Sequence, residues 1–357
     1  MTIIGARPQF IKAAAFENAL KTHSDRSIQH ILVHTGQHFD EKMSSVFFRE
    51  LDIGEPTYNL GVSGGTHGEM TGRMLIQVEK LLLECPPDWV LVYGDTNSTL
   101  ASALAAAKLQ IPIAHVEAGL RSFNMAMPEE INRVLVDRVS TLLFCPTDSA
   151  VENLRNEGVV HGVSQVGDVM YDVALRFAVR ADLESDALRR LDLIKGNYVL
   201  ATCHRAENTD DLIRLTEILT ALNTIAIEAT VVMPIHPRTK SKISHFGLSK
   251  LIENVVVIEP LSYLDMVQLE KNAAAIITDS GGMQKEAFFY KVPCITTRDE
   301  TEWIETVDNN WNVLTGAASE TIINAYHGIG HRNPNECNPY GNGQTAEYIL
   351  SKILSET

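Results

Sequence analysis

The chain has 357 residues, of which 45% are hydrophobic, a length that suits two domains with sizeable cores. Its formal net charge of −15 and isoelectric point near 5.2 argue against nucleic acid and anionic membranes as partners, because both bind basic surfaces. A small anionic ligand stays compatible with this composition, since it needs only a local positive site.

The sequence also indicates a compartment. Its five cysteines are scattered without a CxxC pair, which favours reduced thiols. The first residues, MTIIGARPQF, lack the basic segment and apolar run of a signal peptide. No apolar run approaches the roughly 18 residues needed to span a membrane. We therefore expect a cytoplasmic protein.

Short apolar runs alternate with helical patterns along the chain. The runs predicted to be strands are residues 2–4, 30–35, 89–94, 111–117, 141–146, 198–203, 230–236, 255–259, 274–279 and 293–297. Strands separated by helices are typical of parallel sheets covered on both faces. The polar, helix-prone segment 174–197 predicts a boundary between domains at 1–173 and 174–342, with a C-terminal helix at 343–357 that packs on the first.

Two segments repeat one pattern, in which a strand ends in an acidic residue beside the start of a helix. VLVYGDTNSTLASALAAAKLQIPIAHVEAG carries Asp95 and Glu117, and AAIITDSGGMQKEAFFYKVPCITTRDETE carries Asp279 and Glu302. The pattern predicts an α/β fold of two doubly wound, Rossmann-like domains facing a cleft. Ligands bind beyond the carboxyl ends of parallel strands, so we expect the site in that cleft.

One side of the expected site suits an anion. In GARPQF, a strand turns at Gly5 and presents Arg7 at the start of a helix; in CHRAEN and TDSGG, polar residues and glycines follow strands. Peptide N–H groups at a helix N-terminus favour phosphate. An ordinary strand-to-helix turn explains each motif taken alone. The residues assigned to phosphate or ribose are Arg7, His204, Arg205, Ser280, Gly281, Gly282 and Glu286.

The other side is acidic. Asp95 and Glu117 each follow an apolar strand, and Glu129 lies in the first turn of a helix that begins at Pro128. An N-cap role for Asp95 and a helix-dipole role for Glu129 are the structural alternatives. Glu117 alternates with His115 on one face of a strand expected to be buried, where a carboxylate needs a partner or a function. No zinc-ligand spacing and no GxSxG motif is present, and we expect neither metal nor cofactor.

With these motifs the chain resembles the non-hydrolysing UDP-N-acetylglucosamine 2-epimerases from end to end. The matching motifs are GARPQ, GQH, YGDTNST, HVEAGLRS, PEEINR, the His-Arg pair at 204–205, TDSGG, RDETE and NPYGNGQ. The resemblance implies a glycosyltransferase-B-like fold, a homodimer, and interconversion of UDP-GlcNAc and UDP-ManNAc.

The resemblance also implies a mechanism. UDP leaves C1 as the C2 proton is removed, which gives a 2-acetamidoglucal; the proton then returns on the other face and UDP adds back. Asp95, Glu117, Glu129 and His204 are implied as catalytic residues, and Leu261 joins the UDP-binding set. A second, activating UDP-GlcNAc site is implied at Gln37, His38 and Arg73, and we expect Arg121 and Arg133 to hold the carboxylates.

Several positions depart from the family pattern. Gln9 stands where Glu is usual, Lys285 replaces the first Glu of Q-E-E, and Trp303-Ile304 replaces Arg-Pro. GLRSFNMAMPEE also replaces a longer family segment. These variants resemble an O-antigen and capsule branch that includes enzymes for UDP-2,3-diacetamido-2,3-dideoxy-glucuronate, so that sugar is the alternative substrate.

Three other functions compete with this prediction. They are a retaining glycosyltransferase of the same fold, a hydrolysing 2-epimerase, and a catalytically silent regulator that binds UDP-sugars. GARPQ and PEEINR favour the non-hydrolysing epimerase over the first two. Retention of Asp95, Glu117 and Glu129 argues against a regulator, which needs no such acids.

Overall fold

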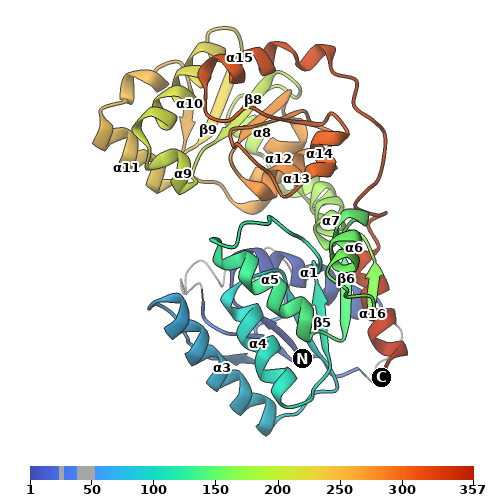
Figure 1. Ribbon diagram of the computed structural model, residues 1–357. Helices are drawn as coiled ribbons and strands as arrows, with labels where there is room; N and C mark the ends of the chain where they lie inside the picture. Colours follow the sequence, from blue (N-terminus) through green and yellow to red (C-terminus); the bar gives the residue numbers. More distant parts are fainter. Residues whose placement is uncertain (24–27, 38–52) are drawn as a thin grey trace. The chain divides into compact units, whose positions relative to one another are not determined.

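A computed structural model describes residues 1–23, 28–37 and 53–357, and these residues form two compact α/β units (Figure 1). Unit 1 comprises Met1–Val173 together with Asn338–Thr357, and unit 2 comprises Ala174–Cys337. Helix α7 (Val169–Glu184) runs from the first unit into the second, and the chain returns to the first unit between Cys337 and Asn338.

The described part of unit 1 contains a parallel sheet of seven strands in the order β3-β2-β1-β4-β5-β6-β7. The strands are β1 (Thr2–Ile4), β2 (Leu32–His34), β3 (Tyr58–Asn59), β4 (Val90–Tyr93), β5 (Ile113–Val116), β6 (Leu142–Cys145) and β7 (Val163–Gln165). The helices are α1 (Arg7–Thr22), α3 (His67–Glu84), α4 (Asn97–Lys108), α5 (Pro128–Val139), α6 (Asp148–Asn156) and α16 (Thr345–Ser355).

The described residues of unit 2 form a parallel sheet of six strands in the order β10-β9-β8-β11-β12-β13. The strands are β8 (Tyr198–Thr202), β9 (Thr230–Pro234), β10 (Val256–Ile258), β11 (Ala275–Thr278), β12 (Cys294–Thr296) and β13 (Asn312–Leu314). The helices are α8 (Ala187–Arg190), α9 (Ala206–Thr209), α10 (Leu212–Ile225), α11 (Pro237–Phe246), α12 (Tyr263–Asn272), α13 (Gly281–Phe289), α14 (Ile304–Asp308) and α15 (Ser319–His327), with 3₁₀ turns at Ser249–Ile252 and Ile329–His331.

The central strands are the most deeply buried parts of each sheet. Every residue of β4, β5 and β6 is buried, and so is every residue of β11 and β12. Strands covered on both faces must be apolar throughout, which explains the continuous apolar runs in the sequence. In unit 1, α16 buries Ala346, Ile349 and Leu350, and it contacts α1 (Figure 1).

The structure confirms the α/β fold with two parallel sheets, and each of the ten predicted runs contains a strand. The strands that were not predicted are β3, β7 and β13, and all three lie at the edge of a sheet. An edge strand needs no long apolar run, and β3 is only the exposed pair Tyr58–Asn59.

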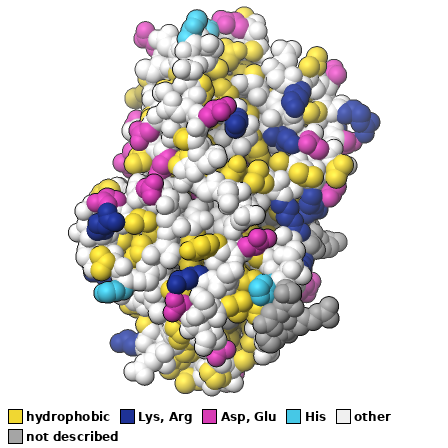
Figure 2. Space-filling view, turned by 90° about the vertical axis from the view of Figure 1, so that its right-hand side faces the viewer, with side chains coloured by type: hydrophobic (Ala, Val, Ile, Leu, Met, Phe, Trp, Pro, Cys, Tyr) yellow, Lys and Arg dark blue, Asp and Glu magenta, His cyan; other side chains and the backbone are white. Residues whose placement is uncertain are grey.

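The surface agrees with the acidic composition. Acidic side chains are scattered over the face that Figure 2 shows. Within the described parts of the chain, no helix combines the length and apolar character that crossing a membrane requires.

Candidate functional site

The acidic cluster of unit 1 lies where the adjacent parallel strands β4 and β5 end. Asp95 follows β4, and its Oδ2 pairs with Arg133 Nη2 of α5 at 2.6 Å. Asn132, also on α5, donates from Nδ2 to the Asp95 carbonyl at 2.7 Å and so fixes the backbone there. The N-cap of α4 is Thr96 rather than Asp95, so the N-cap alternative for Asp95 is wrong. The Asp95 carboxylate is left available for another role.

Burial dominates the electrostatics of Asp95. It raises the pKa of this carboxyl group above the ordinary value, and the negative charge of Glu117 acts in the same direction. The charges of Arg133 and Lys12 oppose the increase but do not cancel it. A carboxyl group with a raised pKa is better suited to exchanging a proton near neutral pH than an ordinary aspartate.

Glu117 follows β5 and is held in an uncommon conformation. Its φ of 69° lies in the left-handed region, which a residue with a side chain adopts only when its surroundings impose it. The backbone N–H groups of Glu117 and Ala118 both donate to the Phe144 carbonyl at 3.1 Å. The side chain is 6% exposed and pairs with Lys12 of α1. The conformation therefore fixes this carboxylate beside a cation at the end of the strand.

A glycine gives Glu117 its space. Gly94 has φ 60°, and a Cβ atom there would lie 3.1 Å from Glu117 Oε2 and 3.5 Å from Lys12 Nζ. A larger residue would push into the ion pair and would also be strained by its backbone. Gly94, which follows β4, thus makes room for the carboxylate that follows the neighbouring strand β5.

The two acids at the start of α5 differ in their surroundings. Glu130 is buried, accepts from the N–H groups of Ser122 and Phe123 at 3.0 and 2.9 Å, and pairs with Arg133 at 2.9 Å. Burial alone would raise its pKa, but these bonds outweigh burial and lower it. Glu129, the predicted catalytic residue, is only partly buried. Glu130 therefore anchors the preceding loop, and Glu129 is the more accessible of the two.

Arg121 does not hold the candidate catalytic carboxylates. Its Nη1 pairs with Asp137 Oδ2 at 2.8 Å, and its Nε and Nη2 bind Glu157 at 2.6 and 2.9 Å. Asp137 also binds His115 Nδ1 at 2.7 Å, and the side chains of Asp137 and His115 are fully buried. The expected role of Arg121 is therefore wrong, because it is bound by Asp137 of α5 and by Glu157, which follows α6. The expected role of Arg133 is confirmed for Asp95.

The cluster of unit 2 is organised by Asp279, which follows β11 and is fully buried. Asp279 accepts from the backbone N–H of His204 at 2.9 and 3.1 Å and from that of Arg205 at 2.9 Å. Asn208 Nδ2 donates to the same carboxylate at 3.2 Å. One buried acid thus fixes the turn after β8, and the His204 side chain stays 41% exposed.

The N-terminus of α13 lies beside this turn. Ser280 is the N-cap and accepts from the Met283 N–H at 3.4 Å. A Cβ atom on Gly281 would come within 2.9 Å of Glu302 Oε1 and 3.6 Å of Arg205 Nη2, so a larger residue would have to displace the Glu302 carboxylate. Peptide donors and a positive helix end therefore lie together with Arg205, which is the arrangement that binds phosphate.

Glu286 and Leu261 are the other residues of unit 2 that the sequence assigned to UDP. Glu286 Oε1 accepts from the Tyr263 hydroxyl at 3.2 Å. Burial raises the Glu286 pKa to about 7, although Tyr263 and Lys285 oppose it. Leu261 is partly buried against a hydrophobic cluster of the unit.

Comparison with known proteins identifies the family. The sequence model of the family described as UDP-N-acetylglucosamine 2-epimerase matches residues 19–354. The chain belongs to this family. The UDP-2,3-diacetamido-2,3-dideoxy-D-glucuronate 2-epimerase of Pseudomonas aeruginosa is 52% identical over 358 residues, which cover 99% of this chain and 98% of that protein. The UDP-N-acetylglucosamine 2-epimerase of Methanocaldococcus jannaschii is 46% identical, with 99% and 98% covered.

Solved structures agree with the family. A crystal structure of the Methanocaldococcus jannaschii UDP-GlcNAc 2-epimerase in complex with UDP-GlcNAc and UDP matches with a TM-score of 0.88 and 42% identity. The match covers 100% of this chain and 99% of that one. The resemblance stated from the motifs is confirmed, and so is the fold that it implies.

In this epimerase-family chain, sequence reasoning missed Lys12 as the partner of Glu117. A signal was present, because Lys12 is a single basic residue in the otherwise apolar stretch FIKAAAF. It also missed Asp279 as an organiser, although that residue stands in the motif TDSGG.

The residues implied for the activating site are only partly described. Gln37 Oε1 accepts from the Ser98 N–H at 3.0 Å and from its hydroxyl at 2.7 Å, at the start of α4. Arg73 Nη2 donates to the carbonyls of Ser63, at 3.0 Å, and Gly64. His38 and the side chain of Arg7 lie outside the described residues. An activating site at Gln37, His38 and Arg73 therefore stays a prediction.

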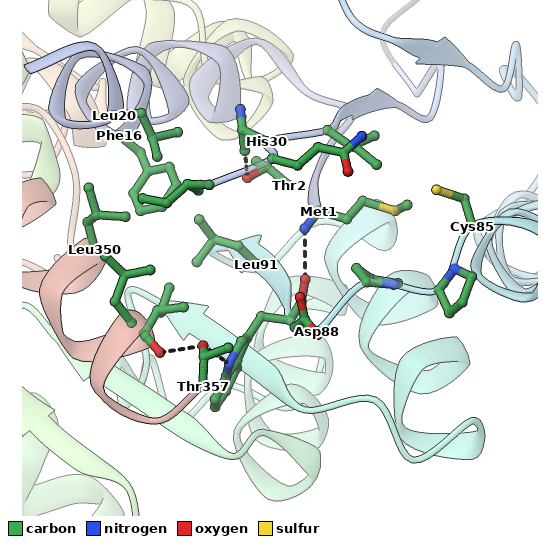
Figure 3. Close-up of a pocket in the computed structure, with 18 residues that line it drawn as sticks. Met1, Thr2, Phe16, Leu20, His30, Cys85, Asp88, Leu91, Leu350 and Thr357 are labelled. Atoms are coloured by element: carbon green, nitrogen blue, oxygen red, sulfur yellow. Dashed lines mark hydrogen bonds between the residues drawn. The ribbon is translucent and has the colours of Figure 1, made fainter. Parts of the chain in front are cut away.

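Unit 1 also holds a cavity of about 410 Å³, which lies at the other end of the strands, where they begin (Figure 3). Thr2, Ile31 and Leu91 line it where strands begin, and Leu350 and Ile353 of α16 close one side. The Met1 amino group donates to the Trp89 carbonyl at 2.8 Å beside it. The candidate acids follow strand ends, so this cavity is separate from them. Nor do the described residues gather three His, Cys, Asp or Glu side chains as metal ligands.

Proposed function

We propose that this protein is a non-hydrolysing 2-epimerase that interconverts UDP-N-acetylglucosamine and UDP-N-acetylmannosamine. The observation that carries the proposal is the pair of carboxylates, Asp95 and Glu117, at the ends of neighbouring strands and each paired with a cation. Membership of the epimerase family supports it. A protein that only binds UDP-sugars would need no such fixed pair of acids.

The chemistry divides the reaction into elimination and re-addition. The C2 proton of the sugar has no carbonyl neighbour and is weakly acidic, so its removal accompanies departure of UDP from C1. The product is a 2-acetamidoglucal, to which the proton returns on the other face while UDP adds back. Asp95, Glu117 and Glu129 are the groups assigned to proton transfer and to the positive charge that develops at C1.

The residues of unit 2 are assigned to UDP. His204, Arg205 and the segment Ser280–Gly282 supply donors for the diphosphate, whose negative charge grows as it leaves C1. Glu286 is assigned to the ribose hydroxyls and Leu261 to the uridine end of the ligand. The pairing of the His204 and Arg205 N–H groups with Asp279 supports this assignment, because it fixes the backbone that carries both side chains, and the His204 side chain stays 41% exposed although its Nδ1 lies 3.5 Å from Asp279 Oδ1.

A second substrate is favoured by one observation. The 52% identical relative is named for UDP-2,3-diacetamido-2,3-dideoxy-D-glucuronate, whereas the Methanocaldococcus jannaschii relative named for UDP-GlcNAc is 46% identical. The same acids would perform the same chemistry on that sugar. We also propose a homodimer in the cytoplasm, as the resemblance and the sequence imply, and the activating site at Gln37, His38 and Arg73.

Proton NMR of the purified protein with UDP-GlcNAc in D₂O tests the proposal. We expect UDP-ManNAc to form with deuterium at C2, since the proton leaves and returns through exchangeable groups. Free ManNAc would mean a hydrolysing enzyme. If C2 keeps its proton although UDP binds, UDP-2,3-diacetamido-2,3-dideoxy-glucuronate is tested next, and failure there too would contradict the proposal.

A further inference from the structure

Two of the departures from the family pattern contact each other. Lys285 Nζ of α13 lies 3.9 Å from the centroid of the Trp303 ring, and both residues are buried, at 3% and 7% exposure. An ammonium group over an indole face is a favourable cation–π arrangement, strongest when water is excluded. The two substitutions therefore act as a pair, with Lys285 fixing the orientation of the indole.

This orientation leaves the indole N–H of Trp303 without a hydrogen-bond partner in the interior. The other two tryptophans differ in this respect. Trp89 Nε1 donates to Thr357 Oγ1 at 3.0 Å, and Trp311 Nε1 donates to the Asn335 carbonyl at 3.2 Å. A buried donor without a partner costs free energy unless something accepts from it, so this one calls for an acceptor.

The Trp303 N–H lies at the N-terminus of α13. Its Nε1 is 3.3 Å from the position that a Cβ atom on Gly281 would occupy. Gly281 and Lys285 are one helical turn apart, so the indole lies along a single face of the helix. Its donor end is at the free peptide groups of the helix start, and its ring is over Lys285.

The charges around this donor favour an anion. Arg205 Nη2 is 3.6 Å from the same Gly281 reference point, and the helix end adds positive potential. Glu302 Oε1 is also close, at 2.9 Å, but its carboxylate is paired with Arg298 Nη1 at 3.0 Å. Arg205 Nη2 lies 4.0 Å from Glu302 Oε1, so two arginines flank this one carboxylate, and the helix N-terminus and the indole N–H add donors beside them.

We propose that Trp303 Nε1 donates a hydrogen bond to a diphosphate oxygen of the bound UDP-sugar, and that Lys285 is the positioning residue for its ring. The assignment rests on the proposed function, because it places the diphosphate at the start of α13. It adds a neutral donor that binds substrate and leaving group alike, so it contributes to affinity for UDP.

Indole resonances of ¹⁵N-labelled full-length protein provide the first test. The chain has three tryptophans. The signal that disappears in Trp303→Phe belongs to Trp303, and the variants Trp89→Phe and Trp311→Phe assign the other two signals. We expect the Trp303 N–H signal to move on addition of UDP and of inorganic pyrophosphate, because both supply the acceptor. A Trp303 signal that moves with UDP-GlcNAc but not with UDP would overturn the diphosphate assignment.

Calorimetry with UDP gives the second test. Trp303→Phe keeps a ring over Lys285 and removes only the donor, so UDP should bind roughly tenfold more weakly, as expected for a lost bond to a charged acceptor. Trp311→Phe is the matched control and should bind UDP as the wild type does. Equal affinity of Trp303→Phe and wild type, with an unmoved indole signal, would refute this inference alone. Wild-type protein that binds no UDP would refute the proposed function and the inference with it.

Discussion

The acids of unit 1 and the donors of unit 2 are stabilised in opposite ways. In unit 1, Asp95 pairs with Arg133 and Glu117 pairs with Lys12, so each candidate acid already has a cation. In unit 2, the buried acid Asp279 accepts backbone N–H groups, and the indole donor of Trp303 is buried without a hydrogen-bond partner. The acids of unit 1 therefore have their partners, whereas the cluster of unit 2 keeps a buried donor without one.

This difference matches what the two parts of the reaction need. Proton transfer requires carboxylates whose position and protonation are fixed before substrate arrives, and paired cations provide this. A diphosphate brings its own negative charge, so its site needs donors and positive potential that are not already neutralised. The comparison predicts that changes to the candidate acids of unit 1 alter the rate, whereas changes to the donors of unit 2 alter UDP affinity.

The largest expected effect comes from the acids. Asp95→Asn or Glu117→Gln should lower kcat by roughly 10²–10⁴, the usual contribution of a positioned acid or base. Turnover is measured as UDP-ManNAc formation by NMR. Either variant should bind UDP as the wild type does, because the donors of unit 2 are untouched. Near-wild-type turnover would remove that residue from the mechanism.

Arg121 should behave differently from the acids although it lies in the same stretch, HVEAGLRS, as Glu117. Arg121→Met leaves Asp137 and Glu157 without their buried cation, and breaking such a pair costs about 3–5 kcal/mol of unfolding free energy. Urea denaturation of the full chain measures this loss. The folded fraction should keep its kcat within a few fold, and a loss comparable with that of Asp95→Asn would contradict the structural role of Arg121.

The stability of unit 2 should depend on pH. Burial raises the pKa of Glu286 to about 7, and burial together with Glu286 raises the pKa of the neighbouring Glu270. The native state therefore holds more protons than the unfolded chain, whose glutamates have an ordinary value of 4.5. Stability is then greatest below pH 4.5 and falls as the pH rises through about 7.

Urea denaturation at pH 5 and pH 8 measures this dependence. We expect the free energy of unfolding to be lower at pH 8 by on the order of 1–3 kcal/mol. Glu270→Gln keeps the shape and removes one buried charge, so it should flatten the difference. A wild type that is equally stable at both values, or a variant with an unchanged slope, would contradict the assignment to this pair.

The sequence predicted those parts of the fold and site that depend on local pattern. The central strands are apolar throughout because both faces are covered, and Asp95 and Glu117 were found because they end such strands. Edge strands such as β13 carry no such pattern. The partners of the acids are also not local, since Lys12 and Glu117 are 105 positions apart.

Contacts between distant side chains were the part that sequence alone did not reveal. Arg121 and Arg133 both follow the strand that precedes Glu117. Arg133, on α5, pairs with Asp95, whereas Arg121 pairs with the buried Asp137. Lys285 and Trp303 were each recognised as departures, yet their contact depends on how α13 packs beside the segment that precedes α14. Only the tertiary structure turns two separate substitutions into one interaction.

The smallest expected effect is the coupling between these two residues. Lys285→Glu places a further carboxylate beside Glu286 and against the negative face of the Trp303 ring, so it should destabilise the protein. Trp303→Arg places a guanidinium beside the Lys285 ammonium and should destabilise it as well. The double variant restores the family's usual Glu and Arg, whose opposite charges attract. Urea denaturation of the four proteins should give a favourable coupling of about 1–2 kcal/mol, and strictly additive losses would show that the two departures are independent.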